Sequence, residues 1–355
     1  MTFIPQDCTP SLVSVITPIF NLAEFVRETF DSVLGQTYRP IEMIVVDDGS
    51  TDGSHREIES WLDGAALDRQ FTFRLVRTEN QGAASARNLA LSLAEGEFIQ
   101  YLDGDDLLHP SKLAVEVAGS RSCGTTVYGD CRRFACRKRD ILLYPPLVLP
   151  RPECFLQDWF RGWFILPAAF LWKRSDVAAN GPWNPLLGID DDMEYAVRFL
   201  VNGGSWKYCP NGWAYYRMFL NMRPRLTTST RPCHLWNLLE VLDAMESRLA
   251  EKGLLEECRE AFAAQFWLLA KRAAFHADVQ REAMTRFERL SRDGRLPEPW
   301  QERALYKLLG IRRRKRLVTF LRRYLAIQPF RPIAAVQSVA DVYAFDHPTE
   351  GEMAG

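Results

Sequence analysis

The sequence lacks several patterns that would assign its class at once. It has eight cysteines but no pair in CxxC spacing, and the nearest two, Cys131 and Cys136, have no histidine close to them. A zinc site is therefore not indicated. No apolar run approaches the ~18 residues of a membrane-spanning helix, and the start, MTFIPQDCTP, has neither the basic residues nor the apolar core of a signal peptide. These absences predict a cytoplasmic protein with reduced cysteines.

The chain also has little net charge. Its 355 residues include 44 Lys and Arg against 45 Asp and Glu, so the formal charge is -1 and no overall field favours a nucleic-acid partner. Hydrophobic residues make up 47% of the chain. This composition fits a globular protein of two domains, or of one large domain with an extension.

What the sequence does have is a regular alternation of apolar runs and helical patterns. The runs predict strands at 12–17, 41–46, 71–76 and 97–102, and the patterns between them predict helices at about 22–34, 54–62 and 83–94. Asn21 and Glu24 are predicted to cap the first helix. This order predicts an α/β fold with a mostly parallel sheet covered by helices on both faces.

The character of the chain changes after about residue 225. Helical periodicity dominates at 238–249, 258–275 and 279–290. We therefore predict a helical extension over 226–327, followed by a tail over 328–355.

Polar clusters follow three of the predicted strands, at 18–21, 47–50 and 103–106. In parallel sheets, ligands bind outside the carboxyl ends of the strands. The three clusters are therefore expected along one rim of the sheet.

The strongest of these clusters stands in FIQYLDGDDLLHP at 98–110. Its carboxylates, Asp103, Asp105 and Asp106, repel one another unless a positive charge lies among them. An Asp-x-Asp at a strand end can hold Mg²⁺ or Mn²⁺ through oxygen atoms and leave positions open for phosphate. Asp106 is interpreted separately, as a cap for a helix that begins near Pro110. Asp-x-Asp alone is a weak motif, and the strand-end setting strengthens it.

Two further motifs are open to a functional and an ordinary interpretation. In VVDDGSTDGS, Asp48 could accept hydrogen bonds from a nucleobase or a ribose, or the segment could be an ordinary strand-to-helix turn. In ENQGAASARN, Gly82 permits a turn, and Arg87 could contact phosphate through paired donors or could be a surface arginine.

Later segments are equally ambiguous on their own. The acids Asp190, Asp191 and Asp192 stand at the start of an amphipathic helical pattern. One of them could act as a general base, or all three could interact with the positive end of the helix dipole. GIRRRKRLVTFLRRYLAI at 310–327 has the composition of a helix on an anionic membrane, of a docked helix with a basic face, or of a nucleic-acid patch.

Taken together, these pieces resemble the inverting family 2 glycosyltransferases of the GT-A fold. The resemblance runs from about residue 12 to residue 222. It is carried by VSVITPIFN, SVLGQTY, IEMIVVDDGSTDGS, ENQGAASARN, EFIQYLDGDDLLHPSKL, LPAAFLWKRS, DDDMEYAVRFLVNGG and YYR. Each motif is weak alone, but their common order is specific. The resemblance implies a GT-A domain over 1–225, with its nucleotide-binding half at about 12–106 and its acceptor half at about 107–225.

The resemblance also implies roles for individual residues. The nucleotide-binding residues would be Pro18, Phe20, Asp48, Gly82, Arg87 and Asp103. The Asp-x-Asp falls on Asp103 and Asp105, which would hold Mn²⁺ or Mg²⁺, with Asp105 as the more direct ligand. The general base falls on Asp192, with Asp191 as the acid before it. This register is open by one residue, because the acids are consecutive.

One position departs from the family pattern. Family members often carry a histidine two residues after the arginine of YYR, where this chain has Phe219. The departure is the single sequence feature that favours the alternative function, a nucleotide-sugar-binding module of the same fold without turnover. A nucleotidyltransferase and a dinucleotide dehydrogenase fit less well, because TPIFNLAEF lacks the glycine-rich loop that each would need after the first strand.

The expected partners follow from the resemblance and from the basic helix. The donor would be a nucleotide-diphosphate sugar, and the acceptor a hydroxyl of a glycan or of a lipid-linked acceptor in cell-surface polysaccharide or glycolipid synthesis. Residues 311–325 offer contact with an anionic membrane, which would place the protein at the cytoplasmic face. No nucleic-acid partner is expected.

Overall fold

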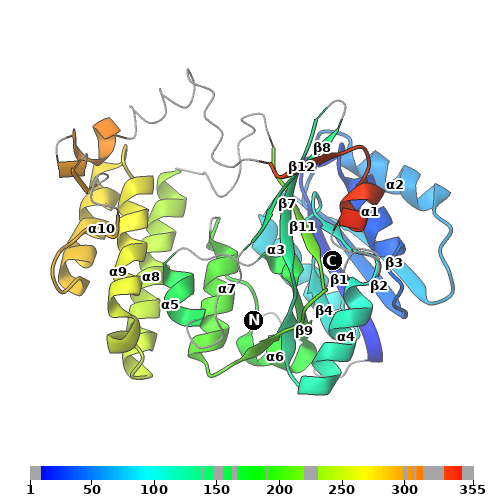
Figure 1. Ribbon diagram of the computed structural model, residues 1–355, viewed down its shortest axis with the longest axis horizontal. Helices are drawn as coiled ribbons and strands as arrows, with labels where there is room; N and C mark the ends of the chain where they lie inside the picture. Colours follow the sequence, from blue (N-terminus) through cyan, green and yellow to red (C-terminus); the bar gives the residue numbers. More distant parts are fainter. Residues whose placement is uncertain are drawn as a thin grey trace, which may run out of the picture.

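The computed structural model describes residues 9–137, 140–147, 155–161, 166–188, 190–219, 231–298, 303–304, 306–307, 309–314 and 332–345. Within these residues, an α/β part and a helical part lie side by side, with α5 (Phe155–Phe160) and α7 (Asp191–Val201) between them (Figure 1). The predicted α/β class and the helical region after it are both confirmed.

The main sheet has seven strands in the order β10-β6-β9-β4-β1-β2-β3. The strands are β1 (Thr9–Ile19), β2 (Ile41–Asp47), β3 (Phe71–Arg77), β4 (Gly96–Tyr101), β6 (Thr126–Tyr128), β9 (Phe170–Lys173) and β10 (Trp206–Tyr208). Only β9 runs against its neighbours, β4 and β6. The remaining neighbours pair in parallel, as the alternating sequence pattern predicts.

The sheet is buried because its central strands are apolar on both faces. Every residue of β2 is buried, which is the pattern expected of a parallel strand covered on both sides. The helices of this part are α1 (Val26–Leu34), α2 (Ser54–Gly64), α3 (Ala83–Leu93), α4 (Lys112–Cys123) and α6 (Arg174–Asn180). Phe30 of α1 and Trp61 of α2 pack edge to face, with ring centroids 5.1 Å apart. The short 3₁₀ helix η2 (Pro167–Ala169) precedes β9.

The first helix begins later than predicted, and the predicted capping pair is wrong. Helix α1 starts at Val26, and Phe25 stands at its N-cap without a side-chain hydrogen bond. Asn21 lies outside the helix with φ of 55°. Its side-chain oxygen accepts a hydrogen bond from the Thr51 amide at 2.8 Å, so it joins two loops of the rim instead.

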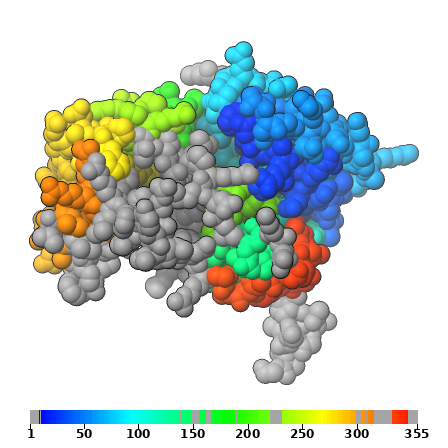
Figure 2. Space-filling view, turned by 90° about the horizontal axis from the view of Figure 1, so that it is seen from above, coloured from blue at the N-terminus to red at the C-terminus, as the bar shows by residue number. Residues whose placement is uncertain are grey.

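A second sheet of five strands has the order β12-β8-β7-β11-β5. Its strands are β5 (Leu107–Leu108), β7 (Cys131–Cys136), β8 (Ile141–Pro146), β11 (Ala214–Arg217) and β12 (Ala334–Val336). Residues 334–345 lie in the segment predicted as a tail, yet they form β12 and α12 (Val339–Phe345). In Figure 2 this C-terminal segment, in red, lies on the outside of the α/β part and away from the yellow helices. Val342 is fully buried there, which a solvated tail would not provide.

The helical part consists of α8 (Pro232–Glu251), α9 (Leu255–Arg272) and α10 (Ala277–Leu290), close to the predicted ranges. Helix α9 packs against α8, α10 and α5, and α8 also contacts α7. Phe160 of α5 and Phe262 of α9 join the two parts, with ring centroids 4.9 Å apart. None of the described helices is both long enough and apolar enough to cross a bilayer.

Candidate functional site

The three polar clusters do meet at one rim of the main sheet. In the pairing of β1 with β2, Ile19 stands opposite Asp47, so these strands end together. The Asp48 amide donates to the Ile19 carbonyl at 2.8 Å. Strand β4 ends at Tyr101 beside β1, which places Asp103 and Asp105 in the next loop along the same rim. The strand-end argument therefore locates the clusters correctly.

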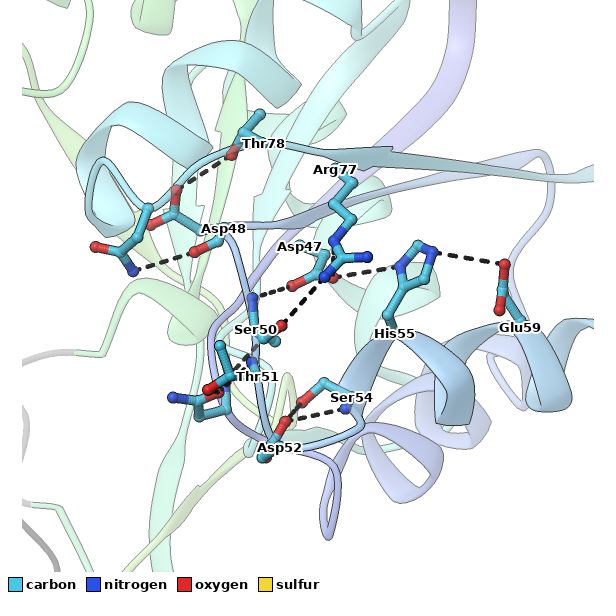
Figure 3. A network of polar contacts seen from close by, with 12 residues as sticks. Asp47, Asp48, Ser50, Thr51, Asp52, Ser54, His55, Glu59, Arg77 and Thr78 are labelled. Carbon is cyan, nitrogen blue, oxygen red and sulfur yellow. Dashed lines mark hydrogen bonds and ion pairs between the residues drawn. The ribbon is translucent and has the colours of Figure 1, made fainter.

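The Asp47 side chain holds the loop after β2 in place (Figure 3). It is fully buried, and its Oδ1 accepts from the Ser50 amide at 2.9 Å. Its Oδ2 lies 3.3 Å from His55 Nδ1 and 3.5 Å from Arg77 Nε. The buried charge is thus surrounded by donors and cations, as burial of a carboxylate requires. Asp47 orders the loop that carries Asp48.

Asp48, the predicted base-recognition residue, joins β2 to the start of α3. Its Oδ1 accepts from the Gln81 amide at 2.8 Å and from the Thr78 hydroxyl at 3.2 Å, and its Oδ2 accepts from the Gly82 amide at 2.8 Å. A carboxylate has about four acceptor positions, so these three donors leave one. Gly82 holds φ of 92° at the N-cap of α3, a conformation that side chains rarely adopt.

Pro18 and Phe20 lie where β1 leaves the sheet. Pro18 is within the last residues of β1, opposite Val46 of β2. Phe20 follows the strand and exposes 47% of its surface, which is unusual for a phenylalanine. An exposed ring beside the Asp48 loop is suited to stacking on a flat ligand group.

Arg87 lies at the centre of the site, on the first turns of α3. Its Nη2 donates to Asp103 and its Nη1 to Asp191, each at 2.7 Å. The guanidinium also lies over the ring of Trp183, 4.5 Å from its centroid. Burial lowers the pKa of Arg87, but the two carboxylates raise it more, so the group stays charged. The ordinary interpretation as a surface arginine is wrong, because its side chain is only 5% exposed.

The guanidinium of Arg87 is engaged mainly by protein groups. Both terminal nitrogens are taken by carboxylates, and Nε is buried with no hydrogen-bond partner among the described residues. What the structure does show is that Arg87 joins the Asp-x-Asp loop to the start of α7.

The three consecutive acids at the start of α7 have different surroundings. Asp190 pairs with Arg272 of α9, and Asp191 pairs with Arg87 of α3. Asp192 accepts from the Met193 amide at 2.8 Å. Among the described residues no ion pair involves Asp192. Two arginines from opposite sides therefore hold the first two acids, and the third lies outside these two ion pairs.

These surroundings change the pKa values of Asp191 and Asp192. Burial raises the pKa of Asp192 to about 8, and the negative charges of Asp191 and Asp190 add to the effect. Burial also raises the pKa of Asp191, although Arg87 opposes the change. A carboxyl group with a pKa near 8 is basic enough to remove a proton from a hydroxyl in a transition state.

Asp103 and Asp105, the predicted metal ligands, stay partly exposed, whereas Asp106 is buried. Asp106 does not cap the next helix, which corrects that prediction: α4 starts at Lys112 with Ser111 before it. Instead, Asp106 Oδ1 accepts from the Arg217 amide at 2.9 Å. Burial and the charges of Asp105 and Asp103 raise the pKa of Asp106 well above its usual value.

In the sequence, Arg217 stands out only as part of the family motif YYR, which does not reveal its role. Arg217 is 2% exposed. Its Nε donates to the Asp105 carbonyl at 2.7 Å and its Nη2 to Glu28 at 2.5 Å. Arg217 thus fixes the backbone of the Asp-x-Asp loop from the second sheet. Phe219, at the family's histidine position, packs its ring 5.1 Å from that of Phe25.

The acidic loop offers few side chains to a divalent cation. Within the ranges that the structure describes, no three His, Cys, Asp or Glu side chains converge on one point. Mg²⁺ is commonly bound by one or two carboxylates and completed by waters and substrate phosphates. The two partly exposed carboxylates of Asp103 and Asp105 fit that kind of site.

Comparison with known proteins finds a family match over part of the chain. The model of the family described as Glycosyl transferase family 2 matches residues 14–159, a segment that contains the strand-end rim and Arg87. Over this segment the chain is similar to glycosyl transferase family 2.

Curated relatives of this family 2 domain match over about a third of the chain. The putative teichuronic acid biosynthesis glycosyltransferase TuaG of Bacillus subtilis is 39% identical over 120 residues, which are 33% of this chain and 46% of TuaG. An uncharacterized glycosyltransferase of Rickettsia felis is 39% identical over 113 residues, 32% of this chain and 18% of that protein. The chain thus spans less than half the length of these relatives.

A solved structure extends the likeness to most of the fold. The S. aureus TarS fragment 1–349, crystallised in complex with UDP-GlcNAc, is 16% identical with a TM-score of 0.58. The match covers 88% of this chain and 91% of that fragment. Residues 1–225 make up less than two thirds of the chain, whereas the match covers 88% of it. The shared fold therefore continues into the helical part. The predicted GT-A fold is confirmed.

Proposed function

We propose that this protein is an inverting, metal-dependent hexosyltransferase that uses a nucleotide-diphosphate sugar. The acceptor is a hydroxyl group of a glycan or of a lipid-linked acceptor. The observation that carries the proposal is the difference between the three consecutive acids. Arg272 pairs with Asp190 and Arg87 with Asp191. Asp192 lies outside these ion pairs and has a raised pKa. The family 2 match over residues 14–159 and the fold shared with the UDP-GlcNAc-bound TarS fragment support it.

The nucleotide would lie along the rim formed by β1, β2 and β4. Phe20 offers a ring for the base, and Asp48 retains one acceptor position beside it. Pro18 and Gly82 would shape the same pocket. Asp103, held by Arg87, would meet the ribose or the diphosphate. UDP-GlcNAc is the first donor to test, because the TarS fragment binds it.

Mn²⁺ or Mg²⁺ would be held by Asp103 and Asp105. When bound, such an ion neutralises charge on the diphosphate as it leaves. The protein's own part is to present the two carboxylates at a fixed place. Arg217 holds the Asp105 backbone and Arg87 holds the Asp103 carboxylate, so the loop is ordered from both ends.

Asp192 would act as the general base and Asp191 as its neighbour in the site. The carboxylate of Asp192 accepts the proton of the acceptor hydroxyl while that oxygen attacks the anomeric carbon from the face opposite the diphosphate. Attack from the opposite face inverts the anomeric centre. The ion pair with Arg87 makes Asp191 a poorer base than Asp192. Of these two candidates, which the sequence alone could not separate, Asp192 is therefore favoured as the general base.

Contact with an anionic membrane at the cytoplasmic face belongs to the same proposal. Its support is the basic composition of residues 311–325, of which the structure describes 311–314. Within that piece, Arg312 lies over Phe275 and Arg314 over Tyr306, so these two arginines also contact the helical part.

One calorimetric and kinetic experiment tests the assignment. UDP-, GDP- and dTDP-sugars are titrated into the wild type, Asp105→Asn and Asp192→Asn, with and without Mn²⁺. We expect metal-dependent binding of one nucleotide class by the wild type, weaker binding by Asp105→Asn, and unchanged binding by Asp192→Asn. Turnover of the bound donor should fall by ~10²–10⁴-fold in Asp192→Asn, the usual contribution of a general base.

The outcomes separate the two functions that the sequence left open. Binding without turnover by the wild type would favour the binding module. If Asp192→Asn kept full activity and Asp191→Asn lost its activity, the general base would be assigned to Asp191 instead. Binding that ignores both Mn²⁺ and Asp105 would remove the metal from the proposal.

A further inference from the structure

The helical part contacts the loop that leads into the catalytic acids at three places. Asn237 of α8 donates to the Leu186 carbonyl at 2.6 Å. The ring of His234 lies so close to Gly188 that a Cβ there would come within 2.6 Å of its Nε2. Arg272, at the end of α9, pairs with Asp190. Each contact joins α8 or α9 to the chain just before α7.

The conformation at Asp190 shows why such support is needed. Asp190 is the N-cap residue of α7, with φ of 56° and ψ of 26°, and it makes no capping hydrogen bond with its side chain. A residue other than glycine in the left-handed region costs about 1 kcal/mol or more and persists only where its surroundings hold it. The ion pair with Arg272 occupies the carboxylate that would otherwise cap the helix.

We infer that Arg272 and the helical part position the start of α7, and so the Asp191–Asp192 pair, for the transfer reaction. This inference rests on the proposed function. It assigns a function to the helical part, which lies outside the segment that matches the family. Arg272 is then a positioning residue that acts through Asp190. Arg87 holds the same helix start from the opposite side, so α7 is fixed between the two parts of the molecule.

The ion pair also separates charge. Asp190, Asp191 and Asp192 are consecutive, and three carboxylates in one turn repel one another. Arg272 draws the first acid toward α9, and Arg87 draws the second toward α3. Without Arg272, the Asp190 carboxylate would be free to turn back to the amides of the α7 start and displace Asp192 from its Met193 contact.

The test compares Arg272→Gln and Arg272→Lys with a matched control, Arg286→Gln. Arg286 of α10 pairs with Asp243 of α8 and with Glu282 of its own helix, so its loss breaks ion pairs inside the helical part only. The Arg286 and Arg272 side chains are 23% and 34% exposed, so the two arginines are similarly accessible to solvent. Three quantities are measured on the full chain: kcat and KM for the donor, nucleotide affinity by calorimetry, and hydrogen exchange of the amides over 186–194.

We expect Arg272→Gln to lower kcat by ~10–100-fold, because a small displacement of a reacting group is costly. Nucleotide affinity should stay within about twofold, because the rim is untouched. Exchange over 186–194 should become faster. Arg272→Lys should recover part of kcat, and Arg286→Gln should change neither kcat nor the exchange of that segment.

Two results would overturn the inference. Unchanged exchange over 186–194 in Arg272→Gln would show that Arg272 does not hold the helix start. Faster exchange with an unchanged kcat would show that the contact is structural only. If the wild type turns over no sugar nucleotide, the proposed function fails, and the exchange experiment still decides whether Arg272 holds α7.

Discussion

At the residue scale, three adjacent aspartates show how neighbours alone can give one residue type different properties. Asp190 and Asp191 each form an ion pair with an arginine, whereas no ion pair among the described residues involves Asp192. Burial therefore raises the pKa of Asp192 to about 8. A carboxyl group in an ordinary loop would ionise near its reference value of ~4 and would be a much weaker base.

This difference predicts a pH dependence of the transfer rate. Below pH 8 the Asp192 carboxyl is mostly protonated and cannot accept a proton, so kcat/KM should rise about tenfold per pH unit from pH 6 and level off above about 8. Asp190→Asn removes a charge that raises this pKa, and should move the midpoint to lower pH. The measurement is a pH–rate profile of both proteins, and a flat wild-type profile from pH 6 to 9 would contradict the assignment.

The same shift has a consequence for stability, with a defined sign. The folded state holds the Asp192 proton up to about pH 8, whereas the unfolded chain releases it near pH 4. The unfolding free energy should therefore fall from pH 4 toward pH 8 by more in the wild type than in Asp192→Asn.

The sequence predicted the residues of the rim well and their partners poorly. The carboxylates at strand ends were found because strand ends are visible as the limits of apolar runs. The burial of Arg87 between Asp103 and Asp191 was missed, because it joins residues 104 positions apart. The role of Arg217 was missed for the same reason, since it contacts Asp105 from another sheet.

At the scale of elements, the start of α3 depends on the loop after β2. Asp48 accepts from the amides of Gln81 and Gly82, two donors at the beginning of the helix that have no partner inside it. The helix has no acidic residue of its own in the first turn. The negative charge that stabilises the N-terminus of α3 is thus supplied by Asp48, in the loop after β2.

Replacing Asp48 by Asn should therefore loosen α3. One carboxylate oxygen would become an NH₂ group that faces a backbone donor, and the loss of a charged hydrogen bond costs about 1.5–3 kcal/mol. We expect a lower melting temperature together with weaker nucleotide binding. Glu79→Gln, at an exposed position in the loop between β3 and α3, is the control and should change neither. Normal nucleotide binding by Asp48→Asn would argue against the base-recognition role.

Element boundaries show where sequence patterns stop being informative. The strands and helices of the first hundred residues were predicted within a few residues, because each has a clear period. Capping was predicted wrongly at Asn21 and Asp106, because both side chains serve contacts between segments distant in sequence. Local preference for a cap was overridden by tertiary structure in both places.

At the scale of the whole molecule, the chain returns to its α/β part after the helical part. Strand β12 pairs with β8 in antiparallel orientation, and α12 follows it. Tyr343 of α12 packs against Tyr215 and His109, with ring centroids 5.5 Å away in each case. This return could not be predicted from the sequence, because a strand of three residues is too short to show a period.

Removal of the chain after residue 331 should therefore destabilise the α/β part. It deletes the β12 pairing and the buried Val342. We expect a melting temperature lower by about 5 °C or more, since 1 kcal/mol corresponds to ~2–4 °C for a domain of this size. The matched control ends after residue 345 and removes no described contact. Equal melting temperatures of the two truncated proteins would show that the segment adds no stability.

The pairing of β12 with β8 also sets the order in which the protein can be made. Strand β8 spans residues 141–146 and pairs with β7 on one side, but its partner on the other side comes only at residues 334–336. While a ribosome is still translating the helical part, this side of β8 is an unpaired sheet edge that other chains can join. The second sheet is therefore completed only after residue 336 has been synthesised, and shorter translation products carry an open edge that chaperones or proteases can recognise.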